Sequence, residues 1–120
     1  MKYFYDTYAL IEIHQGNLHY EKYIHEPLIL TRLNLIELMY HFVRLNEREA
    51  GEKYIQYLSS WVIETSSPLL WSAMEFKFQN KKDDVSFADC IGYIYAREHG
   101  IRFLTGDEKF KNLPFVEFVK

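Results

Sequence analysis

The chain has 120 residues, of which 48% are hydrophobic and 18% aromatic, and a formal net charge of −3. This length fits one domain spanning residues 1–120, and the apolar content suffices for a compact core, which excludes a disordered chain. Proteins that bind nucleic acid tightly without sequence preference are usually basic, so the mild negative charge argues against that class. The single Cys90 excludes an intrachain disulfide. Without an apolar targeting or membrane-spanning run, we expect a cytoplasmic protein.

Short buried strands alternate with amphipathic helices along the sequence. Thr7 is expected to cap the first helix, which Gly16 ends, and Thr31 or Asn34 starts the third. Helical spacing predicts further helices over residues 18–25, 47–60, 68–78 and 87–99. Strands are predicted at residues 2–5, 28–30, 61–63, 101–104 and 115–119. This alternation predicts an α/β fold with three layers (α/β/α) around a central, mainly parallel sheet.

The predicted helix that ends at Arg44 carries two rows of apolar residues along its length. We therefore expect this helix to be buried on most sides, with one narrow polar stripe that includes Asn34 and Glu37. The apolar rows consist of Leu33, Ile36, Tyr40 and Val43, and of Leu35, Leu38, Met39 and Phe42.

The stretch from Asp84 to Asp107 forms a helix, a short connection, a strand and an acidic turn. Ser86 is expected to cap the helix, with Asp89 three residues later, and Gly100 fits the C-terminal cap. Asp89 therefore lies in a first helical turn and Asp107 just past a strand. In a parallel sheet these two places lie on the same edge, where ligands bind.

Four carboxylates are predicted to meet at that edge: Asp6, Glu37, Asp89 and Asp107. Each also has an ordinary explanation as a turn or cap residue. Together they form an oxygen-only cluster without a basic partner, for which a bound divalent cation is the usual remedy. Oxygen ligands favour Mg²⁺ or Mn²⁺ over zinc. Thr7 and Thr105 add hydroxyl groups that can hold a water.

The sequence resembles the PIN domain family, most closely the VapC-type toxin ribonucleases of prokaryotic toxin–antitoxin pairs. Order and spacing match over essentially the whole chain, and the last two acidic motifs are the most specific. The matching pieces are Tyr5-Asp6-Thr7, Asn34-Leu-Ile-Glu37-Leu, Ser86-Phe-Ala-Asp89, Leu104-Thr105-Gly-Asp107-Glu-Lys-Phe110 and the terminal Phe115-Val-Glu-Phe-Val.

The resemblance implies an Mg²⁺- or Mn²⁺-dependent endoribonuclease that leaves a 5′ phosphate and a 3′ hydroxyl. The implied metal ligands are Asp6, Asp89 and Asp107, with Glu37 supporting a water or a second ion. Thr105 would orient the nucleophile, and Thr7 and Ser86 are supporting residues. RNA is the implied substrate, and an antitoxin protein is an implied partner.

Two positions depart from the family pattern. Many relatives carry a small or amide residue where Tyr8 stands and another acid where Lys109 stands. Either change implies a narrower pocket or a different number of metal ions. Basic side chains are candidates for guiding the RNA backbone, namely Arg32, Arg44, Lys77, Lys81, Lys82 and Lys109.

Other function classes remain as alternatives. A non-catalytic PIN-like binding module is the main alternative, and the loss of a carboxylate would indicate it. A phosphoacceptor signalling domain requires an acid pair after its first strand, where Asp6 stands alone. The five histidines show no paired spacing of transition-metal ligands.

The 10 tyrosines and 9 phenylalanines suggest aromatic side chains at the surface and hence a homodimer. The expected dimer surfaces are the helix at residues 47–60 and the first two helices.

Overall fold

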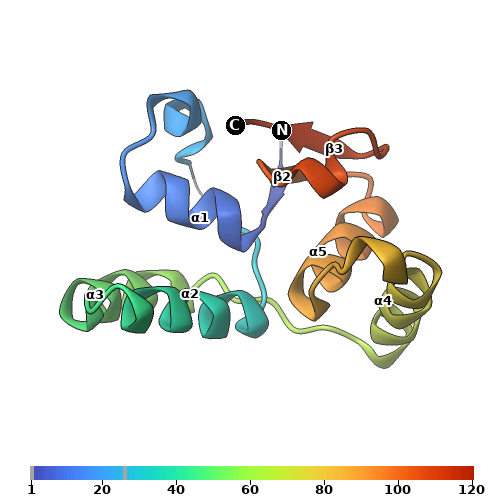
Figure 1. Ribbon diagram of the computed structural model, residues 1–120, viewed down its shortest axis with the longest axis horizontal. Coiled ribbons are helices and arrows are strands. Elements are labelled where there is room, and N and C mark those ends of the chain that lie inside the picture. Colours follow the sequence, from blue (N-terminus) through green and yellow to red (C-terminus); the bar gives the residue numbers. More distant parts are fainter. Residues whose placement is uncertain (1, 26) are drawn as a thin grey trace.

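The computed structural model describes residues 2–25 and 27–120, and its centre is a parallel sheet (Figure 1). The strands are β1 (Tyr3–Tyr5), β2 (Arg102–Thr105) and β3 (Val116–Phe118), in the order β1-β2-β3. Phe4 pairs with Phe103, and Leu104 pairs with Glu117. The first strand of the chain thus lies beside a strand that begins almost a hundred residues later.

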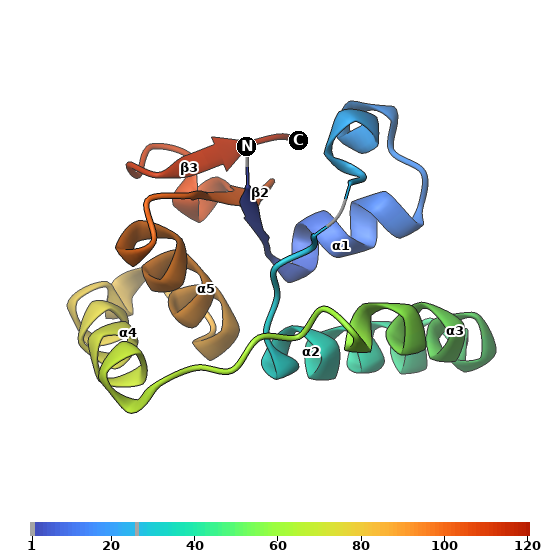
Figure 2. The same cartoon turned by 180° about the vertical axis from the view of Figure 1, so that it is seen from behind.

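In the described part of the chain, α-helices cover both faces of this sheet, with α1 to α3 on one side and α4 and α5 on the other (Figures 1 and 2). The described helices are α1 (Thr7–His14), α2 (Arg32–Arg44), α3 (Arg48–Ser59), α4 (Ser67–Gln79) and α5 (Phe87–Glu98). Short 3₁₀ segments are η1 (Leu18–Tyr23), η2 (Lys81–Asp83) and η3 (Glu108–Phe110). None of the described helices is long and apolar enough to cross a membrane.

Strand alternation produces the three layers. Phe4 and Phe103 point to the core formed with α4 and α5, whereas Tyr5 and Leu104 point to the core formed with α1, α2 and α3. Successive side chains of a strand face opposite sides, so a sheet of such apolar residues needs cover on both faces. The predicted three-layer α/β/α architecture is confirmed.

The strands predicted at residues 28–30 and 61–63 are only isolated parallel bridges. Phe4 bridges to Ile29, and Leu30 bridges to Val62. The amide of Tyr5 donates to the carbonyl of Ile29 at 2.9 Å. The bridges extend the sheet beyond β1, but the chain enters α2 after Thr31, too soon for a longer ladder to form.

The prediction that α2 is buried on most sides was wrong. Its row of Leu33, Ile36, Tyr40 and Val43 is exposed, with Tyr40 at 68% and Val43 at 62%. In the other row, Leu35, Leu38 and Phe42 are buried against α1 and α3, whereas Met39 is 47% exposed. Apolar periodicity shows which residues share a face but not whether this chain supplies the cover for that face.

Two local predictions also differ from the structure. Asp6, not Thr7, caps α1, because its carboxylate accepts a hydrogen bond from the amide of Ala9 at 2.8 Å. The segment predicted as a helix at 18–25 is the 3₁₀ helix η1, which Asn17 caps. The Ser86 cap of α5 is confirmed, since its hydroxyl oxygen accepts from the amide of Asp89 at 3.1 Å.

Gly92 of α5 provides a test of how closely this helix packs on the sheet. A Cβ at Gly92 would lie 2.3 Å from the ring of Phe4 and 2.9 Å from the ring of Phe103. Both rings are fully buried, so the clash should outweigh the gain in helix propensity of about 1 kcal/mol. We expect Gly92→Ala to destabilise by roughly 1–3 kcal/mol and to lower the melting temperature by several degrees. The exposed control Gln56→Ala should melt like the wild type.

Candidate active site

Asp6 lies directly after β1 and is 98% buried, with only 2% of its surface exposed. Its amide donates to the carbonyl of Leu104 at 3.2 Å, so the parallel pairing of β1 with β2 fixes its place. Its carboxylate accepts from the amide of Ala9 and forms a hydrogen bond with the Thr105 side chain. The residue that caps α1 is therefore also attached to the end of β2.

The electrostatics of Asp6 show which acids surround it. Burial raises the pKa of this carboxyl well above its usual range, and the neighbouring Asp89 and Asp107 raise it further. The hydrogen bonds from Thr105 and Ala9 act in the opposite direction but do not compensate. The charges of Asp89 and Asp107 therefore act on Asp6 across this edge of the sheet.

Asp89 connects the cluster to α2. Burial raises the pKa of Asp89 to about 6, and the charges of Glu37 and Asp107 add to this effect. Hydrogen bonds with Ser86 partly oppose the increase. Asp89 is therefore an element of a cap and a member of the acidic cluster at the same time. Its coupling to Glu37 brings the fourth predicted carboxylate into the same neighbourhood.

A chain of hydrogen bonds holds Glu37. The Thr7 hydroxyl donates to Glu37 Oε1 at 2.5 Å, and Asn34 Nδ2 donates to Thr7 Oγ1 at 3.2 Å. Asn34 Oδ1 in turn accepts from the amide and the hydroxyl of Thr31, at 2.9 and 3.0 Å. The Thr7 hydroxyl therefore holds the Glu37 carboxylate. Asn34, which is fully buried, was not predicted as a site residue.

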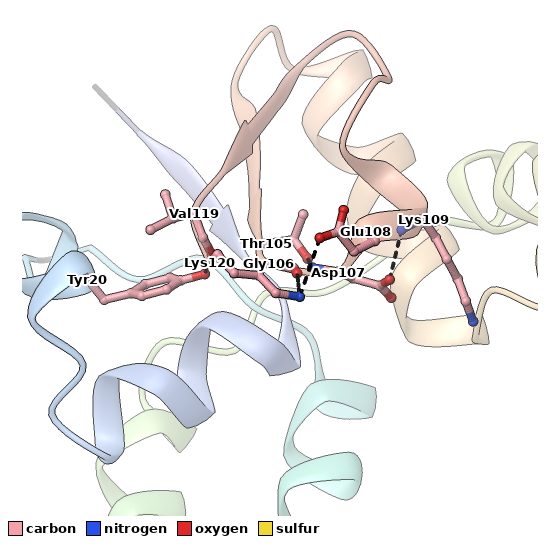
Figure 3. Close-up of polar contacts among 8 residues, drawn as sticks. All are labelled: Tyr20, Thr105, Gly106, Asp107, Glu108, Lys109, Val119 and Lys120. Atoms are coloured by element: carbon pink, nitrogen blue, oxygen red, sulfur yellow. Dashed lines mark hydrogen bonds and ion pairs between the residues drawn. The ribbon is translucent and has the colours of Figure 1, made fainter.

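Asp107 sits on a tightly constrained turn. Thr105 Oγ1 accepts from the amide of Asp107 at 3.0 Å, and Asp107 Oδ1 accepts from the amide of Lys109 at 3.0 Å (Figure 3). Between them, Gly106 leaves no room for a side chain, because a Cβ would lie 2.2 Å from the Tyr8 ring. The departure from the family pattern at Tyr8 therefore fills space beside the acidic turn.

The donor set fits a hard divalent cation. It consists of carboxylate oxygens with hydroxyl groups nearby, and oxygen donors of this kind suit Mg²⁺ or Mn²⁺. Among the described residues, the ion pairs are Arg48–Glu52, Arg102–Glu117 and Lys120–Glu108, so none neutralises the cluster. In the same part of the chain, no group of three or more His, Cys, Asp or Glu side chains is arranged so that it could hold a metal ion. Asp6 and Asp107 instead use their oxygens to cap α1 and η3.

The predicted guiding cations have different partners in the structure. Lys77 donates to the carbonyl of Val85, and Lys81 lies over the Phe78 ring, at the α4 side of the molecule. Lys109 lies at the acidic turn, and its Nζ donates to the carbonyl of Asp84 at 3.0 Å. Lys120, which is not among the predicted guiding cations, also reaches this turn (Figure 3). No motif marks Lys120, so only its place in the fold reveals it.

Comparisons with known proteins agree with this arrangement. A toxin–antitoxin complex from Klebsiella pneumoniae contains a chain with a TM-score of 0.71 and 16% identity, covering 98% of this chain and 96% of that one. VapBC2 from Rickettsia felis, bound to a promoter DNA fragment, gives a TM-score of 0.73 and 16% identity, with 99% and 98% covered. At this identity the likeness shows the fold alone. No curated protein sequence matches significantly.

The family follows from the sequence itself. Residues 3–116 match the PIN domain family, which is nearly the whole length of the chain. The match includes all four acidic positions, together with strands β1 and β2 and helices α2 and α5. The chain therefore belongs to the PIN domain family.

Proposed function

We propose that this protein is a divalent-metal-dependent endoribonuclease that hydrolyses RNA phosphodiester bonds. The observation that carries the proposal is the buried carboxylate of Asp6, electrostatically coupled to Asp89 and Asp107 and not neutralised by any of the ion pairs between described residues. An acidic edge of this kind repels a phosphodiester unless a cation intervenes. Membership of the PIN domain family supports a nuclease.

Each acid has a proposed task at this edge. Asp6, Asp89 and Asp107 would hold Mg²⁺ or Mn²⁺, which when bound activates water and polarises a phosphoryl oxygen. Glu37, held by the Thr7 hydroxyl, would orient the attacking water. Ser86 would keep Asp89 in place through the first turn of α5.

Thr105 has a different proposed role from the one that the resemblance implied. It is fully buried, its side chain hydrogen-bonds to Asp6, and its oxygen accepts from the amide of Asp107. A hydroxyl engaged on both sides does not reach a nucleophile. We therefore assign Thr105 to positioning the two acids at the ends of β1 and β2.

The proposed biological role is that of a toxin whose activity an antitoxin protein inhibits. The proposed localisation is the cytoplasm, where RNA is accessible. Both structural neighbours come from toxin–antitoxin complexes. The exposed apolar row of α2 supports binding to another protein, because large exposed apolar residues in one row mark interaction surfaces. A homodimer is proposed on the same ground, with Tyr57 of α3 and Trp71 of α4 as further exposed aromatic residues.

The first prediction concerns the cation. The purified protein should cleave single-stranded or looped RNA with Mg²⁺ or Mn²⁺ and should lose this activity in excess EDTA, because the acids alone repel the substrate. Gel assays of labelled RNA, with the cation restored after chelation, measure this. Unchanged cleavage by pure protein in excess chelator contradicts the metal mechanism. The absence of cleavage under every condition favours the non-catalytic alternative.

The second prediction concerns the acids. Asp6→Asn, Asp89→Asn and Asp107→Asn should each reduce kcat/KM by more than the roughly 10–100-fold typical of residues that only support a ligand. Asn can still accept the capping hydrogen bonds at Asp6 and Asp107, so the fold should persist. Glu37→Gln should reduce kcat/KM by a smaller factor than these three substitutions.

Matched controls use exposed acids outside the proposed cluster. Asp83→Asn in η2 and Glu75→Gln in α4 make the same chemical changes at exposed positions. They should retain wild-type activity. If these controls lose as much activity as the site variants, the residue assignment is wrong.

The third prediction uses the raised pKa values of Asp6 and Asp89. The folded state binds protons at these carboxyls more tightly than the unfolded state, so without metal its stability should fall as pH rises from about 4 through the folded pKa of about 6 for Asp89. Asp89→Asn should flatten this dependence and raise the stability of the metal-free protein near pH 7.5 by about 1–2 kcal/mol, which corresponds to several degrees.

Saturating Mg²⁺ should reverse the order of the two proteins, because a ligand stabilises only the form that binds it. Thermal melts of wild type and Asp89→Asn, in EDTA and in Mg²⁺, test this without a known substrate. The Ser86 cap uses the backbone amide of Asp89, which the substitution keeps. If Asp89 acts only in that cap, the two proteins should therefore shift in parallel.

A further inference from the structure

The chain after β3 runs beside the acidic turn and is held there. The amide of Val119 donates to the carbonyl of Thr105 at 2.9 Å, and the buried Tyr20 hydroxyl donates to the carbonyl of Val119 at 2.5 Å. The ring of His19 contacts the carbonyl of Lys120 through Nδ1 at 3.1 Å. These contacts join η1 to the end of β2 and fix the backbone from which the Lys120 side chain departs.

The ammonium group of Lys120 is directed at the turn rather than into solvent alone. Its Nζ donates to the carbonyl of Gly106 at 3.2 Å and lies 5.7 Å from the centre of the Tyr8 ring (Figure 3). Gly106 immediately precedes Asp107. The side chain is still 60% exposed, so the ammonium has donors left for a ligand.

The ion pair with Glu108 only weakly engages the positive charge of Lys120. The two groups are 3.7 Å apart, and both side chains are more than half exposed. Exposed pairs of this kind contribute little free energy, so a phosphate can replace Glu108 at low cost.

A second lysine flanks Asp107 from the other direction. Lys109 follows two residues after Asp107, and its Nζ is held by the carbonyl of Asp84. In Figure 3 the ammonium groups of Lys109 and Lys120 lie on opposite sides of the Asp107 carboxylate. Both ammonium groups are fixed by backbone carbonyls, so each loses less side-chain freedom on binding a ligand than a mobile surface lysine would.

We propose that Lys120 and Lys109 bind the backbone phosphates on either side of the RNA phosphodiester that is cut at the acidic cluster. The inference rests on the proposed ribonuclease function. A chain with a net charge of −3 has little general attraction for RNA, so fixed cations beside the acids are needed to hold a polyanion there. Single-stranded RNA can bring successive phosphates to both lysines while one phosphodiester faces the acids.

The test measures the salt dependence of RNA binding. In an Asp6→Asn background with Mg²⁺, a short fluorescein-labelled single-stranded RNA is titrated at a series of NaCl concentrations and followed by anisotropy. Each lost phosphate contact on a single strand should reduce the slope of log K against log salt by about 0.7. We expect this for Lys120→Gln and for Lys109→Gln, and about 1.4 for the double variant.

Two controls separate phosphate binding from support of the turn. Lys53→Gln removes an exposed lysine of α3 and should leave the slope unchanged. Lys120→Arg keeps the charge and should also keep the slope. If Lys120 only supports the Gly106 turn, Lys120→Gln lowers the melting temperature and kcat but leaves the salt slope at the wild-type value, which overturns the proposal.

The activity of the wild-type protein, without Asp6→Asn, distinguishes a failure of this inference from a failure of the proposed function. If that chain cleaves RNA and the lysine variants keep the original slope, only the assignment of the lysines fails. If it neither cleaves nor binds RNA, both fail.

Discussion

Burying an ionised carboxylate costs free energy unless hydrogen bonds or a cation compensate, and Asp6 is buried at the end of β1 with only partial compensation. The Ala9 amide and the Thr105 side chain supply hydrogen bonds, yet the pKa stays raised. The N-terminal ends of α1, α2 and α5 face this region from three sides (Figure 2). Helix N-termini carry partial positive charge, which favours acids nearby. The fold therefore places amide dipoles near Asp6, which is in none of the ion pairs between described residues.

Parallel pairing of β1 with β2 converts separate sequence motifs into one site. Tyr5 pairs with Leu104, so Asp6 and Thr105 follow at equivalent positions at the same edge. Gly106 then lets the chain turn tightly against Tyr8, which places Asp107 beside that edge. The same ladder passes on to β3 and carries Val119 and Lys120 to the turn. A shift of the register by one residue would separate these groups and would also exchange the two apolar faces of the sheet.

The local chemistry of the sequence predicted most of this edge. Ser86 followed by Asp89 specifies a helix start, and Asp107 after an apolar run specifies a strand end, so their places follow from short-range rules. Contacts between residues far apart in the chain were harder to predict from the sequence. The Thr7 hydroxyl suits a helix cap, but the Asp6 carboxylate caps α1 instead. The Thr7 hydroxyl therefore donates its hydrogen bond to Glu37. Lys120 reaches the site only through the pairing of β3 and its contact with η1, which no spacing in the sequence encodes.

Helix α2 shows why the apolar pattern was an incomplete guide and why Glu37 nevertheless lies where it was expected. One row of the helix packs on α3 so closely that a Cβ at Gly51 would lie 2.5 Å from the ring of Phe42. That contact fixes the rotation of α2 about its axis, and the rotation directs Glu37 toward Thr7 and leaves Ile36 and Tyr40 in solvent. The buried Asn34 then ties the first turn of α2 to Thr7, so the orientation of Glu37 depends on packing and on hydrogen bonding together.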